Sequence, residues 1–257
     1  MDKRGSVITE TIDRLKTMIV AGEFTAGQRL PTERDLAARL GVSRSSLREA
    51  IRALTLLGVL EARQGDGTYV TSLAPHLLLD AVAMLVELSP AATVLDLLSV
   101  RRVLESAAAA QAAAHITDAQ LAALAACLEE MRHDPQRGDG SVDEVVAADV
   151  RFHEIVTEAA GNAVLAALIG ALSGRTLRAR VWRGHADQGV FARSIGEHEA
   201  IYQALRDRDA TRAAAVAGAH IAAVEAFFRD APERVLPGAG SPPDGVGPPP
   251  GPRPGAA

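Results

Sequence analysis

The chain has 257 residues, which suits two modest domains that each bury a core of their own. Hydrophobic residues make up 48% of the sequence but aromatic residues only 3%, so the core must be aliphatic, and the abundant alanine favours helix over strand. The formal net charge of −5 divides into +2 for residues 1–74 and −7 for the remainder, so charge does not exclude a first domain that binds nucleic acid.

The sequence shows no address for secretion or for a membrane. Its first residues lack the apolar run of a signal peptide. The most apolar stretch, residues 77–88, is too short to span a bilayer and contains Asp80 and Glu87. The single cysteine, Cys127, excludes an internal disulfide and is consistent with a reducing compartment. We therefore expect a cytoplasmic protein that does not bind a membrane.

The first domain is predicted to be a winged helix-turn-helix. Apolar residues recur at helical spacing in Val7–Ala21. Thr32 is a natural N-cap for a second helix and Ser43 for a third, with a glycine turn between the two helices. Two short strands follow, Val59–Arg63 and Thr68–Thr71, joined by a glycine-rich turn. A tight turn between two helices, followed by a hairpin, is typical of this DNA-binding motif.

The rest of the chain predicts helices and no convincing strand. The helical segments are Leu77–Leu88, Thr93–His115, Thr117–Arg132, Val142–Ala160, Ala163–Arg180, Phe191–Asp207 and Ala210–Arg229. One of the expected breaks is Gly184–Gly189. The segment from Pro232 holds nine of the 13 prolines and cannot bury a core. The predicted fold is mainly α, with the winged helix at 1–73, an all-helical bundle for effector binding and dimerisation at 74–231, and a disordered tail at 232–257.

Arginines of the third predicted helix lie apart from its apolar face. Arg44, Arg48 and Arg52 follow one another at four-residue spacing. An arginine in the first turn, such as Arg44, can reach N7 and O6 of guanine in a major groove, while the free N–H groups there attract phosphate. Alone, such a stripe also fits a solvated surface paired with Glu49. In a helix-turn-helix it favours DNA binding.

The motifs of this region resemble those of a known family. Residues 30–70 contain P-T-E-R-D-L-A, V-S-R-S-S-L-R-E and the wing G-D-G-T-Y-V in that order, and they closely resemble the DNA-binding domain of the GntR family of bacterial regulators. The resemblance implies base contacts by Arg34, Arg44 and Arg48, phosphate contacts by Ser43, Ser45 and Ser46, and entry of the wing tip at Gly67 into the minor groove. Asp66 places an unhelpful negative charge at that tip.

Polar residues interrupt the apolar stripes of three later helices. Asp149 and His153, four residues apart, share a face in Val142–Ala160, and His198 and His220 lie on the inner stripes of two further helices. One inward histidine is more often a core residue satisfied by a hydrogen bond than a ligand. Four such groups on three helices, one of them a carboxylate, need a common partner. Three imidazoles and a carboxylate suit Zn²⁺, Ni²⁺, Fe²⁺ or Mn²⁺.

The same pattern resembles the metal-binding helical sensor domain, of the FCD type, found in the FadR subgroup of that family. There an Asp-x3-His motif and two later histidines hold one metal in a helical bundle. The resemblance implies that all four positions bind one divalent transition metal, with zinc as the first candidate. Four other histidines fall outside the pattern and are expected to be ordinary polar residues: His76, His115, His133 and His185.

Arg101 is a further charged residue on a buried stripe. A buried guanidinium requires a carboxylate, which Glu105 or an acid from a neighbouring helix could provide. The subgroup suggests another role, a clamp for an acidic effector bound at the metal. Both interpretations of Arg101 stay open from the sequence.

These features predict a DNA-binding transcriptional regulator, a repressor first and an activator as the alternative. We expect a homodimer on a palindromic operator, controlled by a small carboxylic acid at the metal site. An enzyme is the second hypothesis, since a metal with open positions can activate water. The pattern leaves no inward acid or base, because Glu154 points away from its neighbour His153, so we do not expect an enzyme. A third hypothesis makes the metal itself the signal.

Overall fold

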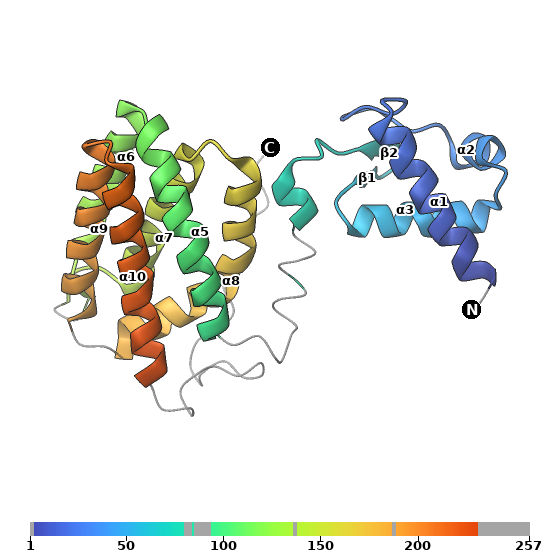
Figure 1. Cartoon of the computed structure of the whole chain (residues 1–257). Helices are drawn as coiled ribbons and strands as arrows, with labels where there is room; N and C mark the ends of the chain where they lie inside the picture. Colours follow the sequence, from blue (N-terminus) through green and yellow to red (C-terminus); the bar gives the residue numbers. More distant parts are fainter. Residues whose placement is uncertain (1–2, 80–83, 85–93, 136–137, 187–188, 231–257) are drawn as a thin grey trace, which may run out of the picture.

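The computed structural model describes residues 3–79, 84, 94–135, 138–186 and 189–230. Its N-terminal part packs helices against a two-stranded antiparallel sheet (Figure 1). These elements are α1 (Lys3–Val20), α2 (Glu33–Leu40), α3 (Arg44–Leu56), β1 (Leu60–Arg63) and β2 (Gly67–Val70). Leu60 pairs with Val70 and Arg63 with Gly67, which closes the hairpin of the wing. The predicted winged helix-turn-helix is confirmed.

Local hydrogen bonds explain where α2 and α3 begin. The side chain of Thr32 accepts a bond from the backbone N–H of Asp35, and that of Ser43 accepts one from Ser46. Each cap satisfies an N–H group that the first helical turn leaves without an intrahelical partner. Leu47 of α3 is completely buried against α1 and α2. The arginines on the other faces of α3 are therefore held at the surface.

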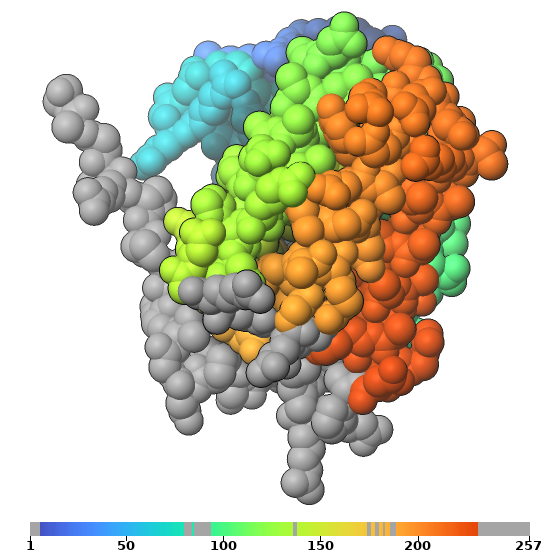
Figure 2. All heavy atoms as spheres, turned by 90° about the vertical axis from the view of Figure 1, so that its left-hand side faces the viewer, coloured from blue at the N-terminus to red at the C-terminus, as the bar shows by residue number. Residues whose placement is uncertain are grey.

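The C-terminal part is a bundle of six helices in the described residues. They are α5 (Val94–His115), α6 (Asp118–Met131), α7 (Val142–Ala159), α8 (Ala163–Ala186), α9 (Val190–Arg206) and α10 (Ala210–Asp230). α10 packs along α5 and α9, and α7 packs against α6 and α8. Figure 2 shows α6 (green), α9 and α10 (orange to red) side by side with their side chains in contact. None of the helices in the described segments is long and apolar enough to cross a membrane.

Small residues let the helices of the bundle approach closely. Ala109, Ala112 and Ala113 of α5 and Ala204 of α9 are completely buried in one core, together with Phe152 of α7. A close-packed interior made of alanine and branched aliphatic side chains agrees with the low aromatic content of the sequence. The bundle is therefore the aliphatic helical domain that the composition predicts.

A predicted boundary that bears on the site is wrong, and α1 also begins at Lys3 and not at the predicted Val7. The sequence predicted a helix that ends at Arg180 and a break from Gly184, but α8 continues to Ala186. A side chain at Gly184 would place its Cβ 2.8 Å from Val142 Cγ1 and 3.1 Å from Phe191 Cζ. This glycine permits close helix packing and does not end the helix. Of the predicted helix at 77–88, only residues 77–79 and 84 are described, and the predicted tail lies outside the described residues.

Candidate metal centre

Four residues of the predicted quartet come together inside the bundle. Asp149 and His153 extend from α7, His198 from α9 and His220 from α10, and each offers one ligand atom within 4.8 Å of all the others. His198 and His220 are almost fully buried, at 0% and 3% exposed. Since the four positions span more than 70 residues of sequence, their convergence is produced by the tertiary packing of three helices.

The spacing of the ligand atoms suits a metal ion. His198 Nε2 lies 3.0 Å from Asp149 Oδ1 and 3.3 Å from His153 Nε2. Bonds of about 2.1 Å to one ion place neighbouring ligand atoms about 3.0 Å apart in an octahedron and about 3.4 Å apart in a tetrahedron. His153 Nε2 lies 3.8 Å from the same Asp149 oxygen, so a small movement would complete the coordination.

Each histidine is oriented by a bond from its other ring nitrogen. Nδ1 of His153 donates to Glu105 Oε2 at 2.8 Å, and Nδ1 of His220 donates to Glu197 Oε2 at 2.7 Å. Nδ1 of His198 donates to the backbone carbonyl of Ser194 at 2.7 Å. With the proton on Nδ1, the lone pair of each Nε2 points toward the centre of the quartet. Outer partners of this kind are a regular feature of metal-binding histidines.

The electrostatics favour the protonation state that metal ligands need at Asp149, His153 and His220. Burial lowers the pKa of His153, and it lowers the pKa of His220 to about 4, so these imidazoles are neutral at pH 7. Burial alone would raise the pKa of Asp149, but Arg180 and His198 lower it well below its ordinary value. The Asp149 carboxylate is therefore ionised while the rings of His153 and His220 are uncharged, as ligation requires.

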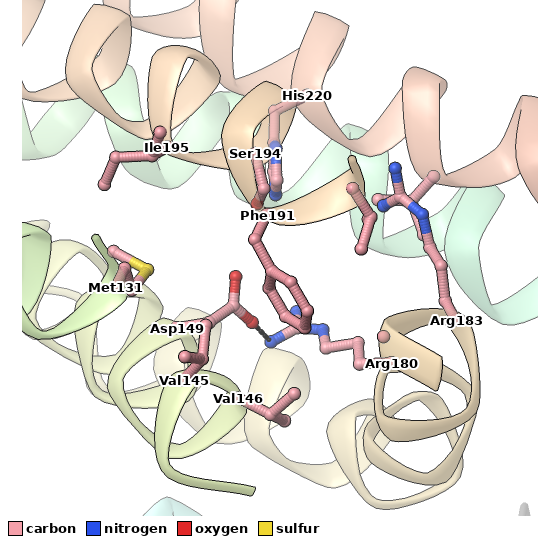
Figure 3. Close-up of a pocket in the computed structure, with 13 residues that line it drawn as sticks. Met131, Val145, Val146, Asp149, Arg180, Arg183, Phe191, Ser194, Ile195 and His220 are labelled. Atoms are coloured by element: carbon pink, nitrogen blue, oxygen red, sulfur yellow. Dashed lines mark hydrogen bonds and ion pairs between the residues drawn. The ribbon is translucent and has the colours of Figure 1, made fainter. Parts of the chain in front are cut away.

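A small cavity opens beside the quartet and is lined by two arginines that the sequence did not single out. Arg180 Nη1 lies 2.5 Å from Asp149 Oδ2 (Figure 3). Arg183 is 8% exposed and lines the same cavity. Its Cζ lies over the ring of Phe227, 5.4 Å from the ring centroid. The cavity also includes His220 and has a volume of about 50 Å³, the space of a few water molecules. The arrangement can therefore accept a small anion next to the quartet.

The sequence did contain a signal for these arginines. Counting back from Arg183 by three and four residues gives Arg180, Thr176, Ser173 and Ile169, which is a single helical stripe. That stripe was hidden because the helix was expected to end at Arg180. The sequence did not assign Glu105 and Glu197 as partners of histidines either. Each glutamate lies on a different helix from the histidine it contacts, and helical periodicity does not reveal contacts between helices.

Arg101 is completely buried and forms the ion pair that was one of its two predicted roles. Its Nε donates to Glu105 Oε1 at 2.7 Å, and its Nη1 donates to Thr176 of α8. The other oxygen of Glu105 accepts the bond from His153. Burial and Arg180 lower the pKa of Arg101. Arg101 is absent from the side chains that line the cavity, so direct contact with an effector stays a prediction for this residue.

The predicted DNA-reading residues lie at the start of α2 and α3. Arg44 and Ser45 are exposed in the first turn of α3. Arg48 is exposed and pairs with Glu33 of α2, with Nη2 2.8 Å from Oε2, which pre-orients the guanidinium. Ser46 is buried and its hydroxyl lies 2.9 Å from that of Ser43, so it supports the cap of the helix.

The remaining DNA-reading residues are Arg34 and the wing tip. Arg34 is exposed beside Asp35. At the wing, Gly67 has a φ of +148°, and a Cβ there would lie 2.7 Å from Arg29 Nε. Arg29 pairs with Asp66, with Nη1 3.6 Å from Oδ1, and the hydroxyl of Tyr69 donates to Asp66 at 2.6 Å. The negative charge that the sequence placed at the wing tip is thus compensated by an arginine from outside the hairpin.

Comparison with known proteins agrees with this architecture. Residues 8–70 match the family described as "Bacterial regulatory proteins, gntR family", and residues 96–223 match the FCD domain. The chain is 32% identical over 213 residues to the HTH-type transcriptional regulator LutR of Bacillus subtilis, covering 81% of this chain and 94% of the relative. It is 30% identical over 203 residues to the galactonate operon transcriptional repressor of Escherichia coli, covering 76% and 85%.

A solved structure shows the same relationship. A Streptococcus agalactiae GntR protein aligns with a TM-score of 0.55 at 28% identity, over 85% of this chain and 99% of that one. A winged helix-turn-helix joined to a helical FCD domain defines a DNA-binding transcriptional regulator, and the relatives are regulators and not enzymes. The chain belongs to the gntR family of bacterial regulatory proteins, in its FadR-like branch, as the motifs predicted.

Proposed function

We propose that this regulator binds a palindromic operator as a homodimer and that a small organic acid, bound at one divalent metal in the FCD domain, controls its affinity for DNA. The observation that carries the proposal is the quartet itself. Three imidazole Nε2 atoms and one carboxylate converge beside a cavity that contains a guanidinium. A nitrogen-rich set of this kind favours zinc, with nickel, iron and manganese as alternatives.

The chain's own residues divide the work at the site. Asp149, His153, His198 and His220 would hold the ion, which supplies a Lewis-acidic centre for a carboxylate. Glu105 and Glu197 keep two of the rings in the ligating tautomer. Arg180 lies beside Asp149 at the cavity and can pair with the acid in a bidentate manner. Because the cavity is small, an acid that enters must displace or reorient Arg180.

The name of a relative supports an acid as the effector. The Escherichia coli repressor is described by its galactonate operon, and galactonate is a sugar acid. An effector regulates only if it binds two conformations of the protein with different affinity. Movement of Arg180 in α8 is a change that such an acid could bring about from inside the bundle.

The metal is tested by elemental analysis and thermal unfolding. We expect about one ion per chain in the wild type, and a lower melting temperature after chelation that added metal restores. His153→Ala and His220→Ala should lose the ion. The matched control is His133→Ala, since His133 is exposed and pairs with Asp139. Equal, near-zero metal in all four proteins, with unchanged melting under chelator, would leave the quartet as an internal hydrogen-bond network.

Effector control is tested with the intact, metal-loaded protein on an operator fragment. His198→Ala should lose both metal and effector response while its winged helix still binds DNA. A response to acid that persists in His198→Ala would separate the effector from the metal.

The expectation of a homodimer rests on the two-fold symmetry of a palindromic operator. One winged helix makes few base contacts, and a two-fold dimer doubles them on a palindrome. We expect the helical domain to hold the dimer, so that deletion of the chain after Pro232 leaves the assembly unchanged in light scattering. A monomer that binds the palindrome with full affinity would contradict this part of the proposal.

A further inference from the structure

The predicted DNA-reading surface contains a carboxylate among its arginines. Glu33 is the first residue of α2, and it contacts Arg48 of α3. The hydrogen bond from Arg48 lowers the pKa of Glu33 below its ordinary value, and the positive charges of Arg44 and Arg52 add to that effect. Glu33 is therefore ionised on a surface that is expected to meet phosphate. Because a negative charge there weakens the attraction to DNA, any benefit of Glu33 must come from its contact with Arg48.

Glu33 binds one edge of the Arg48 guanidinium. Nε of Arg48 lies 3.2 Å from Oε2 and 3.3 Å from Oε1 of Glu33, and Nη2 lies 2.8 Å from Oε2. A guanidinium is planar and carries its five N–H groups in a rigid fork. Bonds along the Nε–Nη2 edge therefore fix the plane of the group and leave its Nη1–Nη2 end available. That end carries the two N–H groups that bind O6 and N7 of a guanine.

An arginine that is not held in this way is attracted to the phosphate backbone. Arg48 is exposed, and its long side chain has many rotamers from which the guanidinium can reach a phosphate. A phosphate contact fixes the protein on DNA but carries no information about sequence. The bonds to Glu33 limit the rotamers of Arg48 before DNA arrives, which lowers the entropy lost when a base is bound. The carboxylate also repels phosphate oxygens from its own position.

Building on the operator binding of the proposed function, we propose that Glu33 is a positioning residue for base recognition, which holds Arg48 toward a guanine and away from the phosphates. The charge of Glu33 lowers the affinity for all DNA, and its geometry increases the discrimination at one base pair of each half-site. Specificity is a difference between affinities, so it can rise while the affinities for right and wrong sequences both fall. Removal of the carboxylate should therefore change affinity and discrimination in opposite directions.

The test uses the full-length protein and the duplex that it selects from a pool of random sequences. Each half-site position is changed in turn, and fluorescence anisotropy measures binding to the selected, changed and unrelated duplexes. The position that Arg48 reads is the one where Arg48→Ala loses discrimination, about 5-fold to 150-fold for a bidentate pair with guanine. At that position Glu33→Gln should lower discrimination at least about threefold. It should bind the unrelated duplex at least about twofold more tightly at low salt.

Glu49→Gln is the matched control for charge. Glu49 is an exposed acid on α3 that pairs with Arg52, so the variant loses the same charge from the same surface and keeps the bonds between Glu33 and Arg48. It should bind unrelated DNA more tightly, as Glu33→Gln does, with unchanged discrimination at the position that Arg48 reads. Melting temperatures are measured first. If Glu33→Gln does not fold, Glu33→Asp takes its place, because the shorter side chain draws the carboxylate away from Arg48, and the same fall in discrimination is expected.

A variant with both Glu33→Gln and Arg48→Ala separates positioning from direct reading. If Glu33 acts through Arg48, this variant discriminates as Arg48→Ala alone does. If the two losses add, or if Glu33→Gln changes the preference at another base pair, Glu33 reads a base itself, as a carboxylate can at N4 of cytosine, and the inference is overturned.

The remaining outcomes separate this inference from the proposed function. If Arg48→Ala loses discrimination and Glu33→Gln does not, the inference is overturned while operator binding through Arg48 is retained. If Arg48→Ala discriminates as the wild type does, Arg48 reads no base, and the inference is overturned while operator binding by other residues is retained. If the wild type prefers no duplex to unrelated DNA, operator binding and the inference are both overturned.

Discussion

The two parts of this regulator place their charged residues in opposite ways. In the winged helix, the buried polar side chains that the structure shows are Thr11 and Ser46, neither of which is charged, and the arginines of α3 are exposed. In the FCD domain, several ionisable groups are buried: Arg101, Glu105, Arg183, His198, His220 and Glu225. The first part presents its charges to a partner that arrives from outside, whereas the second encloses its charges within the bundle.

This difference has an energetic consequence. Exposed ion pairs such as Arg48–Glu33 contribute little to stability, so the DNA-reading surface can change without unfolding its domain. Buried charges are tolerated only in complete networks, so changes to the sensor site should affect binding and folding together. Substitutions in the two domains should therefore differ in their effect on stability.

The largest effect is expected for Arg101→Ala. The substitution leaves Glu105 ionised and buried, without its guanidinium partner, and so should reduce the free energy of unfolding by about 3–5 kcal/mol. Arg52→Ala, which removes an exposed arginine paired with Glu49, should change it by less than about 1 kcal/mol. Urea unfolding of the metal-free proteins measures both. Similar losses for the two variants would contradict the contrast between the domains.

The metal-free protein should lose stability between about pH 6.5 and pH 4. Burial lowers the pKa of His220 from 6.5 to about 4, so the unfolded chain binds more protons in that window and unfolding becomes easier as the pH falls. The loss from this residue is about 3 kcal/mol at its fullest, and below pH 4 it does not grow further. Burial also lowers the pKa of His153, which acts in the same direction. Urea unfolding at a series of pH values measures this loss. The free energy of unfolding should fall less steeply with decreasing pH in His220→Gln than in the wild type.

Arg44→Ala should weaken specific DNA binding by about 1–3 kcal/mol and change the preferred base at one position in each half-site. Its stability should stay at the wild-type value, because Arg44 is exposed. Ser45→Ala, at a predicted phosphate contact, should instead weaken all DNA sequences alike. Fluorescence anisotropy with matched and mismatched duplexes distinguishes the two. If Arg44→Ala binds every duplex with wild-type affinity, the assignment of α3 as the recognition helix is wrong.

The smallest effect is expected for Asp66→Asn at the wing. The change removes the carboxylate that holds Arg29 and leaves one more positive charge free to meet phosphate. Affinity for DNA should rise modestly, and the slope of log affinity against log salt should steepen by about one unit. Arg29→Gln should have the opposite effect on the slope. If the salt dependence of DNA affinity is unchanged in both variants, the Arg29–Asp66 pair stabilises the hairpin and does not affect contacts with phosphate.

Much of the fold follows from local rules that act within a few residues. Helical periodicity located α1 to α3 and the bundle helices, and side-chain caps set the starts of α2 and α3. The boundary error in α8 arose because Gly184 looks like a helix breaker on local grounds. Its actual role, the close approach of Val142 and Phe191, depends on residues far away in the sequence.

The sequence by itself determined which positions point inward, and therefore that Asp149, His153, His198 and His220 share the interior of one bundle. The reason is that the direction of a side chain on a helix depends only on its spacing from its neighbours. Tertiary structure alone decided the partners: Glu105 for His153, Glu197 for His220 and Arg180 for Asp149. Pairing depends on the distances and crossing of separate helices, which packing sets and periodicity does not encode.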